Sequence, residues 1–280
     1  MFVVSVFWAF MAAVFGTEQG KRLFGFIGVG GTLGAILGGT LTAALAAVVG
    51  QANLLLASVA LIELGVWCVY ALGRLARERR LEPGEHAGEE VLGGGALAGV
   101  SRALRSPYLL GICLYMLLFT IGSTFLYFQQ AEIVERGIVD RDARTAFFAR
   151  IDVLVNVLTV VVQAGLTGRL LKWLGIGLTL ALLPAVSVAG FLGLALLPAL
   201  GLVAVFQVLR RAGNFAVARP TREVLFTAVP REDKYKAKSF IDTFVYRAGD
   251  QVGAWSYALL GGLGLGVAGI AWVAVPLSAL

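Results

Sequence analysis

Apolar residues along this chain form long runs that are separated by short polar connections. A bilayer core is crossed by about 20 apolar residues in helical conformation, and most of the runs have that length. We distinguish nine runs, at residues 2–16, 24–49, 52–73, 107–130, 146–167, 174–197, 200–218, 237–260 and 262–279. Because backbone polar groups must be satisfied within the bilayer, this pattern predicts an all-α bundle with nine transmembrane helices.

The composition excludes most other classes of protein. Hydrophobic residues make up 59% of the 280 residues, charged residues make up 14%, and the mean hydropathy is +0.86. A soluble domain of this size could not bury so much apolar surface, and a disordered or disulfide-framework chain has a different composition. Both cysteines lie in apolar runs, and the single histidine, His86, lies in a polar connection. We therefore expect no enzyme activity, no metal and no cofactor.

The charges in the connections predict the orientation of the bundle. Most lysines and arginines lie in alternate connections, namely those with Lys21 and Arg22, with Arg74 to Arg105, with Arg169 and Lys172, and with Arg219 to Lys238. Basic connections stay in the cytoplasm, so the C-terminus is expected there and residue 1 on the outer side. A chain that begins with an apolar segment on the outer side has no earlier transmembrane helix to carry its first residues across the membrane. We therefore expect this chain to be a fragment that lacks N-terminal spans.

The connection at residues 74–106 is the longest, and it mixes charges with three consecutive glycines. This composition is typical of a flexible linker. It divides the chain into residues 1–73, a three-span remnant of an N-terminal half-bundle, and residues 107–280, a six-span C-terminal half-bundle. Ser106 and Pro107 are expected to be the N-cap and first residue of a helix, and another helix is expected to begin at residues 230–233.

Polar side chains within the apolar runs are costly and are therefore candidate functional residues. In the run at 146–167, one stripe at helical spacing is expected to face a wet cavity or other helices: Asp152, Asn156, Thr159 and Gln163. In the run at 200–218, four residues share one helix face: Gln207, Arg210, Arg211 and Asn214. Two adjacent arginines in a membrane need acidic partners or an anionic ligand. They therefore indicate either a structural Arg–Asp network or a substrate or gating site.

Three further carboxylates and two basic residues extend this set. Lys238, Asp242, Tyr246, Gly249 and Gly253 form a stripe in the run at 237–260, with Arg247 and Asp250 beside it. Asp242 and Asp250 are candidates for gating or coupling, although Asp242 could simply pair with Lys238 one turn away. Glu63 is the acidic residue of the run at 52–73, where it could serve proton coupling or be neutralised by a partner.

Two other patterns concern helix packing. Tyr115, Phe119, Ser123, Tyr127 and Gln130 recur at helical spacing, which is typical of packing and also compatible with stacking on a substrate. Gly30, Gly34 and Gly38 are four residues apart, a spacing that favours close approach of a neighbouring helix.

The organisation of the chain resembles a major facilitator superfamily transporter that lacks its first three spans. Gly168 and Arg169 begin a segment, 168–175, that is similar to the family's short glycine and basic loop motif, without its usual Asp and second Arg. The run from Gly30 to Gly39 resembles the glycine-rich motif of the family's fifth span. Two segments, 21–28 and 234–242, resemble the ATP/ADP nucleotide exchange branch and its bacterial relatives. This resemblance assigns phosphate contact to Lys236 or Lys238 and packing or gating to Asp242.

The resemblance and the intramembrane charges together predict a secondary transporter that moves a small anionic solute by alternating access. The substrate-binding residues are expected to be Arg210, Arg211, Arg247, Asp152, Asn156, Gln207, Asn214 and Lys238. The alternatives are a non-nucleotide solute, a lipid-modifying membrane enzyme, and a non-transporting membrane subunit or inactive fragment. We expect a monomer in the bacterial inner membrane, with the lipid bilayer and a small anion as partners and without nucleic acid.

Overall fold

The structure is a computed structural model, and it describes residues 2–49, 51–78, 98–229 and 237–280. Within these ranges the chain is helical and contains no strand. The α-helices are α1 (Phe2–Val14), α2 (Thr17–Val49), α3 (Gln51–Glu78), α4 (Ala98–Arg105), α5 (Pro107–Gly137), α6 (Arg141–Gly165), α7 (Thr167–Leu196), α8 (Leu200–Gly213), α9 (Arg219–Leu225), α11 (Tyr246–Gly262) and α12 (Val267–Ala279). Short turns join them, namely η1 (Asn214–Ala218), η2 (Phe226–Ala228) and η3 (Ile241–Val245).

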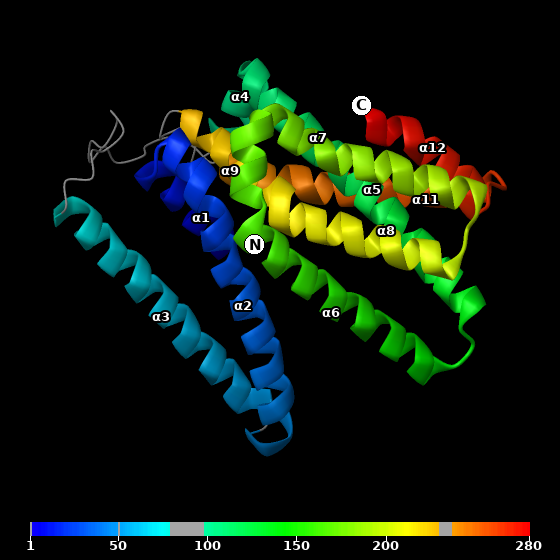
Figure 1. Cartoon of the computed structure of the whole chain (residues 1–280), viewed down its shortest axis with the longest axis horizontal. Coiled ribbons are helices and arrows are strands. Elements are labelled where there is room, and N and C mark those ends of the chain that lie inside the picture. Colours follow the sequence, from blue (N-terminus) through cyan, green and yellow to red (C-terminus); the bar gives the residue numbers. More distant parts are fainter. Residues whose placement is uncertain (1, 50, 79–97, 230–236) are drawn as a thin grey trace.

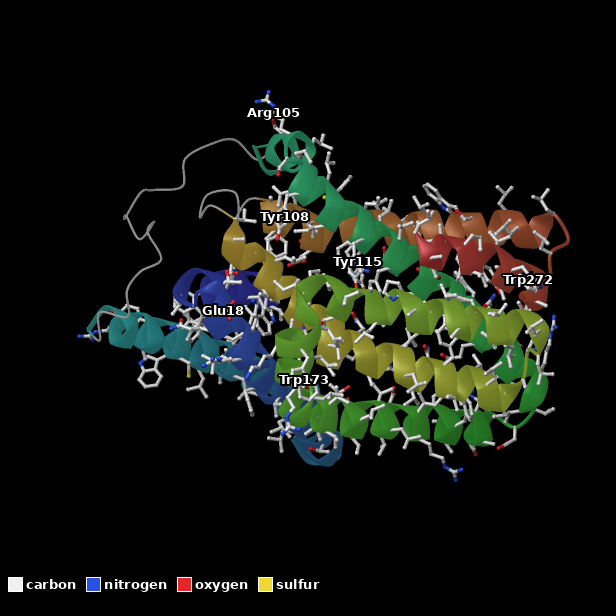
Figure 2. The ribbon with its side chains drawn as sticks, turned by 45° about the horizontal axis from the view of Figure 1, so that its top comes forward. Glu18, Arg105, Tyr108, Tyr115, Trp173 and Trp272 are labelled. Atoms are coloured by element: carbon white, nitrogen blue, oxygen red, sulfur yellow. The ribbon has the colours of Figure 1, made fainter. Side chains whose placement is uncertain are left out.

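Five segments of the described chain are long and apolar enough to cross a membrane: Thr17–Thr40, Pro107–Gly137, Arg141–Gly165, Thr167–Leu196 and Leu200–Ala228. The prediction of a helical membrane bundle is therefore confirmed. The first and last helices, α1 and α12, have 13 residues each, which is shorter than a full span. Large side chains such as Trp173 and Trp272 lie on the outside of the bundle, 69% and 51% exposed, as expected for a surface that meets lipid (Figure 2).

The predicted boundaries need correction at two connections. Residues 168–174 were expected to form a loop, but they continue α7, which begins at Thr167 and kinks at Gly175. Gly175 has φ 72°, a non-helical conformation that strains residues with a Cβ, so the helical geometry is interrupted there and the chain changes direction within α7. The expected linker at 74–106 is helical at both ends, in α3 and α4. Its centre, residues 79–97, lies outside the described residues.

The predicted start of α5 is confirmed in detail. The Ser106 hydroxyl accepts a hydrogen bond from the Leu109 backbone N–H at 3.4 Å, and Pro107 occupies the first helical position. α6 begins in the same manner, because the Asp140 carboxylate accepts from the Ala143 N–H at 2.7 Å. Each cap satisfies one of the backbone donors that a helix start leaves without a partner. The expected helix start at residues 230–233 lies outside the described residues.

The helices from α5 onwards run back and forth along the bundle. The connections α5–α6, α7–α8 and α11–α12 lie at the same end, on the right in Figure 1. α4 and α9, which carry basic residues, lie toward the other end. Basic connections and connections with little net charge thus lie toward opposite ends, which agrees with the alternation read from the sequence.

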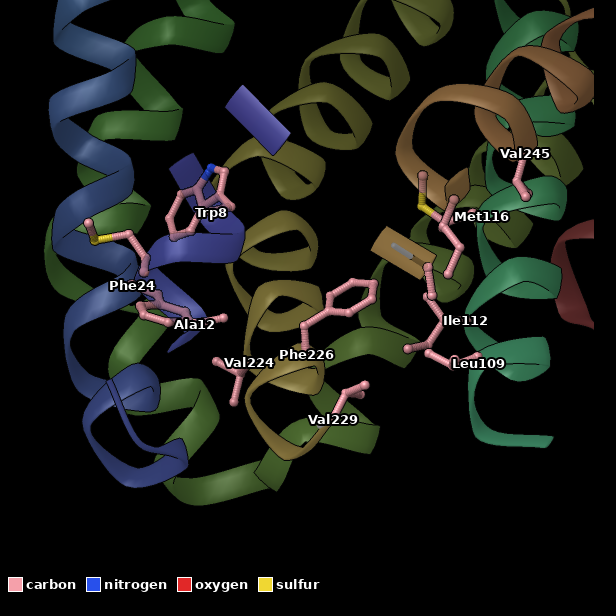
Figure 3. Close-up of a cluster of buried hydrophobic side chains, with 13 residues drawn as sticks. Trp8, Ala12, Phe24, Leu109, Ile112, Met116, Val224, Phe226, Val229 and Val245 are labelled. Atoms are coloured by element: carbon pink, nitrogen blue, oxygen red, sulfur yellow. The ribbon is translucent and has the colours of Figure 1, made fainter. Parts of the chain in front are cut away.

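Two clusters of buried apolar side chains hold the bundle together. The first joins the N-terminal helices to the rest of the chain, because Trp8 and Phe24 pack in the same cluster as Ile112 and Phe226 (Figure 3). The second lies among α5, α7, α8 and α12 and contains the edge-to-face pair Phe191 and Phe206, 5.1 Å apart. α1 and the first part of α2 therefore share a core with the C-terminal part. α3 stands apart, in contact with α2, and its apolar side chains are largely exposed (Figure 1).

Close packing between α5 and α11 depends on two glycines of the predicted stripe. A Cβ at Gly249 would lie 1.8 Å from the Thr120 hydroxyl and 3.2 Å from the Leu117 carbonyl oxygen, and one at Gly253 would lie 2.9 Å from the Thr124 Cβ. The absence of side chains at these positions therefore lets the two helices touch.

Gly249→Val is expected to destabilise the fold by about 3 kcal/mol, because a branched side chain must push α11 away from α5. The matched control is Gly261→Ala in the same helix, where a Cβ would meet nothing within 4 Å. Chemical or thermal unfolding of the purified protein measures both variants. Equal stability of the two variants would contradict the tight α5–α11 contact.

The glycines of α2 that were predicted to form a packing motif do not contact a neighbouring helix among the described residues. A Cβ at Gly30, Gly34 or Gly38 would meet nothing within 4 Å, so this face of α2 has no neighbour in the part of the chain that the structure describes. α2 instead approaches α6 at Gly25 and Gly28, where added Cβ atoms would lie 3.3 Å from the Gln163 carbonyl oxygen and 2.9 Å from its side-chain nitrogen.

Candidate functional site

A cavity of about 1140 Å³ lies among α5, α6, α8, η1 and α11. Seven of the residues predicted to bind substrate or to couple transport line it: Asp152, Gln207, Arg210, Arg211, Asn214, Arg247 and Asp250. They come from α6, the α8–η1 helix and α11, which are far apart in the sequence. The fold thus brings the polar stripes of three helices onto one cavity wall.

Arg210 is the most deeply placed charge of the cavity wall, with 5% of its surface exposed. Its Nε donates to the Ser187 hydroxyl at 3.1 Å, and its two terminal nitrogens donate to the Ser123 hydroxyl at 2.7 Å and the Phe119 carbonyl at 2.9 Å. Its guanidinium carbon lies 4.9 Å from the centre of the Phe119 ring. These partners are neutral, and among the described residues Arg210 forms no ion pair. The positive charge is therefore oriented without being neutralised.

The other two cationic residues predicted here are paired. Arg211 donates to Asp152 at 2.6 Å across the interface between α8 and α6, and Arg247 lies 3.5 Å from Asp250 within α11. The Arg211 and Asp152 side chains are 38% and 56% exposed, so this pair is accessible from the cavity and contributes little stability. The predicted Arg–Asp network thus exists for Arg211 and Arg247 but leaves out Arg210.

The stripe on α5 also faces this cavity. Phe119, Ser123, Tyr127 and Gln130 line it, while Tyr115 does not. Gln130 accepts a hydrogen bond from the side-chain amide of Gln207, which joins α5 to α8. The stripe thus forms part of the cavity wall and also takes part in the contact between α5 and α8.

Arg144 and Glu135 also line the cavity, and sequence reasoning missed both of them. Arg144 donates to the carbonyls of Ile138 and Val139 at 2.7 and 3.1 Å, which fixes it at the start of α6. Arg144 and Asp152 are eight residues apart and therefore lie on one helix face. Extending the predicted stripe toward the N-terminus of α6 would have found Arg144.

The far end of the α6 stripe serves packing. Gln163 donates to the Phe215 carbonyl at 2.9 Å and accepts from the Thr32 hydroxyl at 3.0 Å, so it joins η1 to α2. Thr159 is buried, and Asn156 is not among the residues that line the cavity. The prediction that this stripe faces a cavity or other helices is confirmed, with the two roles divided along its length.

Lys238 does not reach the cavity where the sequence placed it. Its side chain is completely buried and lies 2.7 Å from a Glu223 oxygen and 2.9 Å from an Asp242 oxygen. Its ammonium nitrogen also lies 4.6 Å from the centre of the Phe226 ring. The expected pairing of Asp242 with Lys238 one turn away is confirmed, and Glu223 is a second partner that the sequence did not indicate. Lys238 is therefore part of a buried ion cluster.

Three other predicted residues lie away from the cavity. Glu63 is exposed on α3, and Arg169 is exposed near the start of α7. Gly168 faces the carbonyls of Lys21 and Arg22, which a Cβ would meet at 3.7 and 3.8 Å. Gly168 thus supports the contact between α7 and the start of α2.

The described residues contain no group of three or more His, Cys, Asp and Glu side chains that could hold a metal ion. The cavity offers guanidinium donors, amides, hydroxyls and aromatic rings, which are suited to holding an anion with an organic part. Comparisons of the sequence with protein-family models and with curated proteins gave no match.

Proposed function

We propose that the protein is a secondary active transporter of the major facilitator type that moves a small anionic solute by alternating access. The observation that carries this proposal is Arg210, a buried and un-neutralised cation on the wall of a cavity of about 1140 Å³ inside a membrane bundle. An isolated buried charge is unfavourable unless a counter-charge arrives. An anionic solute supplies that counter-charge, so its binding is favoured at this position.

The ion pairs beside Arg210 support the same function. Arg211 and Asp152 belong to different helices, and their partly exposed pair can open when a carboxylate or phosphate competes for the guanidinium. Exchange of partners between Asp152 and a solute would change how α6 and α8 are held together. Such a pair, present in one state only, biases the access state of a transporter.

The finer proposal is nucleotide exchange. Phe119, Tyr127 and Phe148 line the cavity together with the arginines, so rings that can stack on a base lie near groups that can hold phosphates. The cavity volume of about 1140 Å³ lies slightly above the range of about 300–1,000 Å³ that is typical of small-molecule sites, which suits a solute larger than a simple inorganic ion.

Counterflow in proteoliposomes tests the function directly. The purified protein is reconstituted with an excess of one unlabelled solute inside, and entry of the same labelled solute is followed for ATP, ADP, a dicarboxylate and a neutral sugar. We expect counterflow of at least one anion and none of the sugar. Counterflow of the dicarboxylate alone would exclude nucleotide exchange and leave anion transport. The absence of counterflow for every anion, with the protein folded, would favour a non-transporting membrane subunit.

A further inference from the structure

A second and smaller cavity, of about 110 Å³, lies beside the large one and shares four lining residues with it: Phe119, Asn214, Phe215 and Tyr246. Its other walls come from α1, α5, α9 and η3. Val4, Trp8 and Met116 make part of this wall apolar, while Arg219, Arg222, Glu223 and Asp242 make the rest strongly charged. None of these charged residues lines the large cavity.

Arg222 is a buried charged side chain of this cavity with an unsatisfied hydrogen-bond donor. Only 7% of its surface is exposed, and its Nε has no hydrogen-bond partner. One terminal nitrogen donates to the sulfur of Met116 at 2.7 Å. A thioether is a weak acceptor, whereas a buried guanidinium is stabilised by strong, preferably anionic acceptors. Arg222 therefore has a hydrogen-bond donor, its Nε–H, that no acceptor in the described part of the protein uses.

The charges around this cavity do not balance. Lys238 holds both carboxylates, Glu223 at 2.7 Å and Asp242 at 2.9 Å. Arg219 and Arg222 form no ion pair with any residue that the structure describes. Among the described residues the cluster thus contains three cations, Arg219, Arg222 and Lys238, and two carboxylates, which leaves one positive charge in a largely buried place.

We propose that the small cavity is a binding site for a small monovalent inorganic anion, with chloride as the ligand. One negative charge neutralises the cluster, whereas a divalent anion such as hydrogen phosphate would reverse its charge. The volume of about 110 Å³ is well below the range of about 300–1,000 Å³ that is typical of small-molecule sites, so it suits a small ion rather than a solute of nucleotide size. The Arg222 Nε–H is the principal donor, and Arg219 supplies a second charge at the same wall.

This site goes beyond the proposed transport function, and chloride binding can be measured without any transport. The small cavity lies next to two irregular helical turns. Asn214 and Phe215 begin the π-helical turn η1, and Tyr246 directly follows the π-helical turn η3. Irregular turns of this kind occur frequently at functional sites. An anion bound here therefore lies against the wall that separates the two cavities.

Thermal unfolding of the purified full chain in detergent tests the proposal. Chloride is titrated against gluconate at constant ionic strength, and a saturable rise of the unfolding temperature is expected. Arg222→Gln is expected to weaken the apparent chloride affinity about tenfold or more, because it removes the charged donor. Arg150→Gln, an exposed arginine of α6 outside both cavities, should leave that affinity unchanged.

Three results would overturn the proposal. The first is a wild-type unfolding temperature that does not respond to chloride. The second is a response to phosphate without a response to chloride, which would exclude a monovalent site. The third is loss of chloride binding in Arg210→Gln but not in Arg222→Gln, which would place the anion in the large cavity. If Arg222→Gln does not fold, saturable bromide quenching of Trp8 in the wild type, absent in Trp8→Phe, supports the site, and its absence contradicts it.

Discussion

Arg210→Gln is expected to reduce counterflow of the transported anion by about tenfold to a hundredfold, since a hydrogen bond to a charged group contributes on the order of 1.5–3 kcal/mol. Arg210 is a buried cation of the large cavity that no described carboxylate neutralises, so the anion is its counter-charge. Arg210→Lys keeps the charge but loses the planar fork, and it should retain partial activity.

The fold is expected to survive this replacement. The hydroxyls that accept from Arg210 have acceptors of their own, because Ser187 donates to the Leu183 carbonyl at 2.9 Å and Ser123 donates to the Phe119 carbonyl at 3.0 Å. Removing Arg210 therefore leaves both hydroxyls hydrogen-bonded. An unchanged unfolding temperature together with lost counterflow indicates a role in binding the solute.

The control for Arg210 is Arg150→Gln, which alters an exposed arginine on α6 outside the cavity. It should leave counterflow unchanged. Full counterflow of every transported anion in a folded Arg210→Gln protein would exclude the proposed role of Arg210. A parallel loss of counterflow in Arg150→Gln would show that the assay reports the general loss of basic residues.

Lys238→Met is expected to destabilise the protein by about 3–5 kcal/mol, which is the typical effect of removing one partner from a buried ion pair. Lys238 is completely buried and holds both Glu223 and Asp242. Without it, two carboxylates are left close together in a buried place. Unfolding of the purified protein, followed by heat or denaturant, measures the change.

The double variant Lys238→Met with Glu223→Gln separates charge from packing. It removes one positive and one negative charge together, so it should recover a large part of the stability that the single variant loses. The resemblance to nucleotide exchangers implies instead that Lys238 contacts phosphate. A Lys238→Met protein that is as stable as the wild type but inactive in counterflow would support that role and contradict the structural one.

Most of the candidate site could be predicted from the residue spacing within single helices. Asp152 marks one polar face, and Gln207 with Arg210 and Arg211 marks another; each face follows from helical spacing alone. Because a polar face in a membrane must meet water or other helices, the sequence also indicated that these faces converge. It could not divide the α6 stripe between the cavity, where Asp152 lies, and the contact with α2, where Gln163 lies, since that depends on where α2 crosses.

The ion-pair and hydrogen-bond partners of the charged side chains could not be predicted in the same way. Lys238 and Asp242 are one turn apart, and their pairing is local and was anticipated, whereas Glu223 belongs to α9 and reaches Lys238 only through the tertiary fold. Arg210 and Arg211 are neighbours in the sequence, yet one points to serines and the other to an aspartate. Two adjacent residues of a helix point about 100° apart, so their surroundings are set by different neighbouring helices.

The sequence by itself determined that this is a helical membrane protein, where most of its helices lie, how α5 begins, and which helix faces carry polar residues. These features depend on composition, local spacing and capping, which act within one helix. The tertiary structure decided that residues 168–174 form the first turns of α7 before a kink at Gly175, that no described carboxylate pairs with Arg210, and that Lys238 is buried in an ion cluster. These depend on contacts between distant segments, whose geometry is set when the helices pack.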